Sequence, residues 1–129
     1  MHRLITALFV LVVSATASSA QGLLPAVWKG ENGAILKVLN RDAVNFRGVF
    51  LSSPSGPCPV VPYDVAGRVR GHRVVFQTTR RWTTDCRVTA NWYGRMVDPA
   101  TIATTFVATF VEPSGRRRTV RGTEVFRRI

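Results

Sequence analysis

Two charged side chains are expected to face the interior of this protein, and they are its first candidates for chemistry. Arg80 continues an inward row that passes through Phe76 and Thr78, and Glu124 lies two residues before Phe126 on the last inward row. A charge in an apolar interior is costly unless it is paired. We therefore expect Arg80 and Glu124 either to pair with each other or to hold a polar ligand.

No residue pattern typical of catalysis is present in the sequence. There is no Ser/His/Asp set, no pair of acids at a credible spacing and no phosphate-binding loop. Asp64, Asp85 and Asp98 fall at turn positions, which suit aspartate without any chemistry. We therefore expect no enzymatic activity, no cofactor and no metal site.

The elements that must position the two charges are β-strands, because apolar and polar residues alternate along most of the chain. The clearest stretch is Tyr63 to Arg80, where a two-residue turn at Arg70-Gly71 would place Val69 opposite His72. Gly- or Pro-containing breaks separate similar segments. Strands are expected at about 26–30, 33–40, 45–52, 63–70, 72–80, 86–96, 101–111 and 118–127.

Eight short consecutive strands predict an all-β fold, an eight-stranded antiparallel up-and-down barrel closed so that no edge is exposed. The interior of such a barrel is either filled by side chains or holds one small ligand. Outside the hairpin and the two charges, the alternation predicts these inward residues: Trp28, Gly30, Ala34, Leu36, Val38, Phe46, Phe50, Ser52, Val88, Ala90, Trp92, Ile102, Thr104, Phe106, Ala108, Val120 and Phe126.

The first twenty residues are typical of a secretory signal peptide. His2 and Arg3 form a short charged region, Leu4 to Val13 is apolar, and Ser18 to Ala20 offers small residues for cleavage. The apolar run is too short to span a bilayer, and no other stretch is long enough. We expect residues 1–20 to be the signal peptide, residues 21–129 to be one domain, and the protein to be secreted or periplasmic with no membrane span.

The chain is strongly basic, with a net charge of +11 over 129 residues. Loss of Arg3 with the signal peptide leaves 17 basic and 7 acidic residues, a net charge of +10. Such a balance suits an acidic partner such as nucleic acid, phospholipid head groups or another polyanion. The alternative is a merely solubilising surface, because the arginines alternate with apolar residues and cluster only at Arg116 to Arg118.

Five segments resemble the avidin and streptavidin family in their order and spacing, over nearly all of Val27 to Ile129. They are WKGENGAILKV (28–38), GVFLS (48–52), YDVAGRVRGHRVVF (63–76), ANWYG (90–94) and GTEVFRR (122–128). The resemblance implies a secreted barrel that binds biotin at its open end. It also implies a set of ligand-binding residues: Gly30, Ala34, Phe50, Ser52, Phe76, Arg80, Val88, Ala90, Trp92, Phe106 and Glu124.

Several of these positions depart from the family's pattern. Gly30, Ala34 and Phe50 stand where the family has the Asn, Ser and Tyr that donate hydrogen bonds to the ureido oxygen of biotin. At about 1.5–3 kcal/mol each, losing three such bonds removes roughly three to six decades of affinity. Glu124 is one methylene longer than the family's acid, which accepts a ureido N–H. We therefore expect weakened biotin binding or a different, biotin-like ligand.

Other departures change the walls of the expected site. Arg80 stands where a Trp is usual, and Val88 and Ala90 stand near a Ser and a Thr of the family. Ser52 and Trp92 match the family, and Phe106 keeps an aromatic surface. We expect an apolar base enlarged by Gly30 and Ala34, and a ligand whose anionic end is held outward by Arg80; for Phe76 a filled core is the simpler interpretation.

The resemblance is closest to the short dimeric bacterial avidins. The positions of Cys58 and Cys86 match the disulfide of those proteins, and an exported chain with two cysteines favours a bond between them. A metal site is the weaker alternative, because only His72 could join the two thiols. A homodimer is expected through an uncharged outward row: Ala103, Thr105, Val107, Thr109 and Val111. The alternative function is a cationic exported barrel with a filled interior that binds a polyanion or a protein partner.

Overall fold

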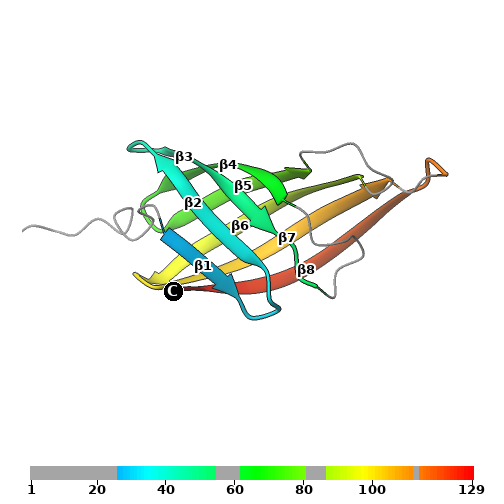
Figure 1. The fold of residues 1–129 in the computed structure, drawn as a ribbon. Helices are drawn as coiled ribbons and strands as arrows, with labels where there is room; N and C mark the ends of the chain where they lie inside the picture. Colours follow the sequence, from blue (N-terminus) through cyan, green and yellow to red (C-terminus); the bar gives the residue numbers. More distant parts are fainter. Residues whose placement is uncertain (1–25, 55–61, 81–86, 112–113) are drawn as a thin grey trace, which may run out of the picture.

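A computed structural model describes residues 26–54, 62–111 and 114–129, with the backbone but not the side chain of Arg80. Eight antiparallel strands close into a barrel in chain order, with β1 paired to β8 (Figure 1). The predicted eight-stranded up-and-down barrel is confirmed. The strands are β1 (Ala26–Gly30), β2 (Ile35–Arg41), β3 (Asn45–Leu51), β4 (Pro62–Arg70), β5 (Arg73–Arg80), β6 (Arg87–Asp98), β7 (Thr101–Val111) and β8 (Arg117–Arg128).

The hairpin of β4 and β5 differs from the prediction in its register. Arg70 pairs with Arg73 and Val69 with Val74, so the turn residues are Gly71-His72 and not Arg70-Gly71. Gly71 has a φ of 58° and takes the first central position, where glycine carries a positive φ without strain. The inward face is nevertheless as predicted, because a shift of two residues keeps alternate side chains on the same side of the sheet. His72 lies in the turn itself and is exposed.

Large side chains fill the part of the barrel near the β2–β3, β4–β5 and β6–β7 turns. Trp28, Phe46, Val74, Ile102 and Phe126 are each at most 1 % exposed. Burial of one such side chain contributes roughly 1.5–3 kcal/mol to folding. This end of the barrel therefore supplies much of the free energy that closes the sheet.

Two glycines let aromatic rings enter the interior. A Cβ atom on Gly67 would lie 2.4 Å from Cζ of Phe46 and 2.6 Å from Cβ of Phe76. A Cβ atom on Gly122 would lie 2.6 Å from Cζ of Phe106. The space that these glycines leave is thus already occupied by phenylalanine side chains from the strands paired with them.

Some predictions fall outside the described residues, namely the signal peptide at 1–20 and the pairing of Cys58 with Cys86. Both stay predictions. Within the described ranges, no helix is long and apolar enough to cross a membrane. In the same ranges no three His, Cys, Asp or Glu side chains come together to hold a metal ion.

Candidate ligand-binding site

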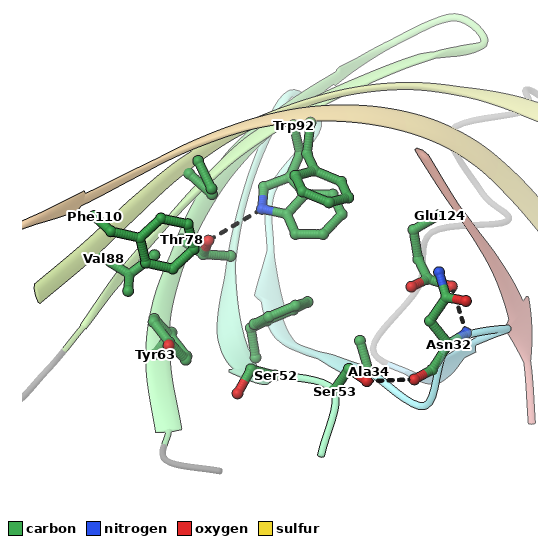
Figure 2. A pocket seen from close by; sticks show the side chains of 14 residues that line it. Asn32, Ala34, Ser52, Ser53, Tyr63, Thr78, Val88, Trp92, Phe110 and Glu124 are labelled. Carbon is green, nitrogen blue, oxygen red and sulfur yellow. Dashed lines mark hydrogen bonds between the residues drawn. The ribbon is translucent and has the colours of Figure 1, made fainter. Parts of the chain in front are cut away.

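A cavity of about 260 Å³ occupies the end of the barrel where β2, β4 and β6 begin and β3, β5 and β7 end. Its volume is close to the lower end of the range for small-molecule pockets, which is roughly 300–1,000 Å³. Figure 2 shows Glu124 and Asn32 on one side of it and Tyr63, Val88 and Phe110 on the other. The lining residues are Asn32, Ala34, Phe50, Ser52, Ser53, Tyr63, Thr78, Val88, Ala90, Trp92, Phe106, Ala108, Phe110 and Glu124.

The cavity exists because three inward positions near the strand ends carry alanine. Ala90 and Ala108 are directly paired on β6 and β7, and Ala34 immediately precedes β2. All three are at most 4 % exposed to solvent. Their methyl groups are too short to meet across the barrel, so the space between the aromatic side chains stays open.

Trp92 forms one wall of the cavity and is held in place on several sides. Its Nε1 donates a 3.0 Å hydrogen bond to Oγ1 of Thr78, and both residues are buried. Its ring stacks on Phe76 at 5.4 Å and 6°, and lies 4.6 Å from Phe106 and 5.2 Å from Phe50. The indole therefore offers a fixed apolar face against which a flat ring can pack.

Glu124 is the charged residue among the described residues of the cavity wall, and its position depends on Gly30. The Glu124 side chain is 5 % exposed, and its Oε1 accepts a 2.9 Å hydrogen bond from the backbone N–H of Asn32 (Figure 2). A Cβ atom on Gly30 would lie 2.7 Å from both Cδ and Oε1 of Glu124. The carboxyl group therefore fills the space beside Gly30 that any side chain there would need.

This arrangement corrects one expectation about the base of the site. Gly30 does not enlarge the cavity, because the longer side chain of Glu124 takes up the volume. Ala34 does line the cavity, as expected. A smaller residue thus enlarges the cavity only where no longer neighbouring side chain occupies the space.

The turn between β1 and β2 fixes the N–H group that holds Glu124. Gly30 N–H donates to the carbonyl of Ala34 at 2.7 Å, and Gly33 N–H donates to the carbonyl of Gly30 at 3.0 Å. The hydroxyl of Ser53 donates to the carbonyl of Asn32 at 2.5 Å (Figure 2). Gly33 has a φ of 93°, which other residues adopt only with strain.

Ser52 is the second polar group of interest in the wall. Its Oγ is buried and makes no hydrogen bond within the described part of the chain. A buried hydroxyl without a partner costs roughly 1–3 kcal/mol. A ligand that hydrogen-bonds Ser52 would recover that free energy.

Eight of the eleven residues expected to bind ligand line the cavity: Ala34, Phe50, Ser52, Val88, Ala90, Trp92, Phe106 and Glu124. Gly30 and Phe76 are buried behind the wall, and Phe76 supports Trp92. The side chain of Arg80 is outside the described part, so its pairing with Glu124 stays a prediction.

The sequence-based set omitted six lining residues: Asn32, Ser53, Tyr63, Thr78, Ala108 and Phe110. Alternation already placed Thr78 and Ala108 inward. Extending the same period by two residues finds Tyr63 before Val65 and Phe110 after Ala108. Asn32 and Ser53 lie outside the strands, where no periodic signal exists.

An eight-stranded up-and-down barrel with a small apolar cavity at one end is an architecture whose interior has room for one small ligand. No protein-family model matches the chain, and no curated protein sequence matches it. Several solved structures do match the chain. The chain is similar to bradavidin2 in its biotin complex, with a TM-score of 0.70 and 24% identity over 81% of this chain and 96% of that one.

Two further avidins give the same result. Rhizavidin in its biotin complex matches with a TM-score of 0.70 and 21% identity, over 82% of this chain and 92% of that one. A variant of shwanavidin in its biotin complex matches with a TM-score of 0.66 and 20% identity, over 81% and 95%. The chain therefore has the avidin-like fold, as the sequence resemblance implied.

Proposed function

We propose that this protein is an exported, non-enzymatic binding protein that holds biotin or a compact biotin-like compound in the cavity. The observation that supports this is a largely apolar cavity of about 260 Å³ whose wall contains eight of the eleven residues assigned from the resemblance. Bradavidin2 and rhizavidin, which share the fold, were each solved with biotin. Isothermal titration with biotin and desthiobiotin tests the proposal, and the absence of heat at high micromolar protein contradicts it.

The affinity for biotin is proposed to be weak. Ala34 and Phe50 line the cavity without a donor, and Gly30 is covered by Glu124. Restoring donors with Ala34→Ser and Phe50→Tyr should tighten biotin binding by about tenfold per hydrogen bond formed. Restoring the third donor requires Gly30→Asn together with Glu124→Asp, because Gly30→Asn alone would collide with Glu124. Titration of the double and quadruple variants separates the two steps.

The chain is proposed to leave the cytoplasm and to carry a disulfide between Cys58 and Cys86. The support is the signal-like segment at residues 1–20 and the cysteine positions of the short avidins. Closure of a loop of this length would stabilise the fold by roughly 3–4 kcal/mol. Mass spectrometry of protein from the periplasm should give a chain that starts near Gln21 and lacks two hydrogens. Two free thiols would contradict the pairing.

A homodimer is proposed to form through the outer face of β5 to β7. Val75, Tyr93 and Thr105 are paired across these strands, and Tyr93 is 55 % and Val75 39 % exposed. The neighbouring outward residues of β7 carry no charge. Such a face is more stable when a second copy covers it. Light scattering at tens of micromolar should give a dimer mass for the wild type and a monomer mass for Val107→Glu; a wild-type monomer contradicts the proposal.

A second candidate function is binding of a polyanion, and one row of arginines favours it. Arg70 pairs with Arg73, and Arg73 pairs with Arg95, on three adjacent strands with all three side chains exposed. Directly opposed like charges are destabilising in a sheet. The ion pair between Arg127 and Glu31 involves none of the three. A bound anionic chain would relieve their repulsion.

Retention on heparin at increasing salt tests this second function. Changing Arg70, Arg73 and Arg95 together to Gln should lower the salt concentration at which the protein elutes. It should also make the binding constant fall less steeply as the salt concentration rises. The matched control changes Arg47, Arg87 and Arg121, which are exposed but lie on three non-adjacent strands. Equal loss of retention in both variants would mean that only net charge matters.

A further inference from the structure

The polar group that dominates the cavity is a hydrogen-bond acceptor. Glu124 is buried, with 5 % of the residue exposed, and its carboxyl group faces a wall made largely of apolar and hydroxyl side chains. No Lys or Arg is among the described residues of the cavity wall. The backbone N–H of Asn32 pairs with one oxygen of this carboxyl group, and a buried carboxylate is costly unless its remaining oxygen is also paired with a donor. The wall is therefore poorly suited to a ligand that turns a carbonyl oxygen toward Glu124.

The resemblance places this acceptor where the avidins have a donor. Gly30 stands at the position of the asparagine that donates to the ureido oxygen, and Cδ and Oε1 of Glu124 occupy the space of the missing side chain. Two other donors of that cradle are replaced by Ala34 and Phe50, which offer no polar atom to the ligand. The electrostatic preference at this point of the site is thus reversed.

The carboxyl group is also oriented for a donor. Oε1 is bound to the N–H of Asn32 at 2.9 Å, within a turn that backbone hydrogen bonds hold together. None of the hydrogen bonds described for Glu124 uses Oε2. The unpartnered Oγ of Ser52 adds a second group that can accept or donate. A planar cation with several N–H groups matches such a set better than a carbonyl does.

We propose that the ligand of this cavity is a compact, largely apolar ring compound carrying a guanidinium- or amidinium-like group that faces Glu124. The ring packs against the fixed face of Trp92, and the N–H groups of the cation donate to the free oxygen of Glu124. The proposal rests on the cavity being a ligand site, but not on biotin being the ligand. Gly30 acts as a specificity-determining residue because it leaves room for the carboxyl group.

Two matched pairs of probes test this inference by isothermal titration. The first pair is biotin and its cyclic guanidinium analogue, in which an N–H group replaces the ureido oxygen. The second pair is benzamide and benzamidinium, which share a ring and differ in the same way. The cationic member of each pair should bind the wild type about 10- to 100-fold more tightly than the neutral member, as expected for a charge-assisted hydrogen bond.

Three variants separate the role of Glu124 from a general effect of charge. Glu124→Gln should abolish the preference for the cation. Glu124→Asp should reduce the preference, because the shorter side chain withdraws from the space beside Gly30. The control is Glu31→Gln, which removes the same charge from the adjoining turn; Glu31 is exposed and pairs with Arg127 outside the cavity. This control should keep the wild-type preference.

The outcomes are distinguishable. If biotin or benzamide binds the wild type as tightly as its cationic partner, the inference is wrong while ligand binding stands. If the cationic probes bind and biotin does not, the inference holds and the biotin proposal fails. If no probe binds at millimolar concentration, both are wrong. If Glu31→Gln abolishes the preference as completely as Glu124→Gln does, the preference depends only on the net charge of the protein. That result would also overturn the inference.

Discussion

The two ends of the barrel interior differ in how they are filled. At the end near the turns 42–44, 71–72 and 99–100, bulky side chains such as Trp28, Phe46 and Ile102 meet and leave no more than 1 % of their surface exposed. At the other end, Ala34, Ala90 and Ala108 face a cavity. More residues separate the strands that meet at this end: 31–34, 52–61, 81–86 and 112–116 lie between them in the sequence.

The comparison shows that small residues have opposite effects at different positions. Gly67 and Gly122 are each covered by phenylalanine rings, and Gly30 is covered by a carboxyl group. In contrast, Ala34, Ala90 and Ala108 leave the space in front of them unfilled and line the cavity. Residue size at one position therefore does not predict a cavity; the side chains opposite must be considered as well.

Adding a methyl group at the filled end should have the largest effect on stability. In Gly67→Ala, the new Cβ would lie 2.4 Å from Phe46 and 2.6 Å from Phe76, so the rings or the backbone must move. Such overpacking costs roughly 1–3 kcal/mol. Urea unfolding measures this cost. Ala66→Gly on the exposed face of the same strand is the control for strand propensity, and an unchanged midpoint for Gly67→Ala would contradict the packed interior.

Removing the hydroxyl that holds Trp92 should have the next largest effect. Thr78→Val keeps the shape of the side chain but leaves the buried Nε1 of Trp92 without its acceptor. Loss of such a buried partner costs about 1–2 kcal/mol in the free energy of unfolding. Thr79→Val, at the exposed neighbouring position, should change stability much less. Equal effects of the two substitutions would mean that the hydrogen bond does not stabilise the fold.

Filling the cavity should stabilise the protein slightly and block its binding site. Ala90→Leu adds apolar groups to the open space and should raise the free energy of unfolding by about 1 kcal/mol, less than the transfer value for that many carbons because some strain is expected. Ligand binding in titration should disappear. Destabilisation as large as that of Gly67→Ala would contradict the difference between the two ends.

Much of the fold followed from the sequence because a barrel repeats one simple rule. Alternation assigned the inward faces of all eight strands, and it survived the two-residue error at Gly71-His72 because the period of a strand is two. For the same reason, alternation predicts cavity-wall residues such as Trp92 and Ala90 from the sequence. It does not predict that Glu124 covers Gly30, because this depends on a contact between β1 and β8, at opposite ends of the chain.

The smallest predicted effect concerns the filled end, where a short turn is closed by an exposed carboxylate. Oδ1 of Asp42 accepts hydrogen bonds from the N–H groups of Asn45 at 2.7 Å and Val44 at 2.8 Å. These bonds, first that from Asn45 and then that from Val44, hold the pKa of Asp42 below its ordinary value of 3.8.

Because the folded state binds this proton less readily than the unfolded state, the carboxylate stabilises the fold above the ordinary pKa. That contribution is lost as the pH falls below 3.8 toward the folded pKa. Asp42→Asn keeps an oxygen that can accept both bonds but removes the ionisation. Unfolding in urea between pH 6 and pH 2 should therefore show a shallower acid decline for the variant than for the wild type, with a difference that is small because the group is fully exposed. If the stability of the two proteins declines in parallel, the turn does not stabilise the ionised form of Asp42. The hydrogen bonds of this turn would then add nothing to the stability of the filled end.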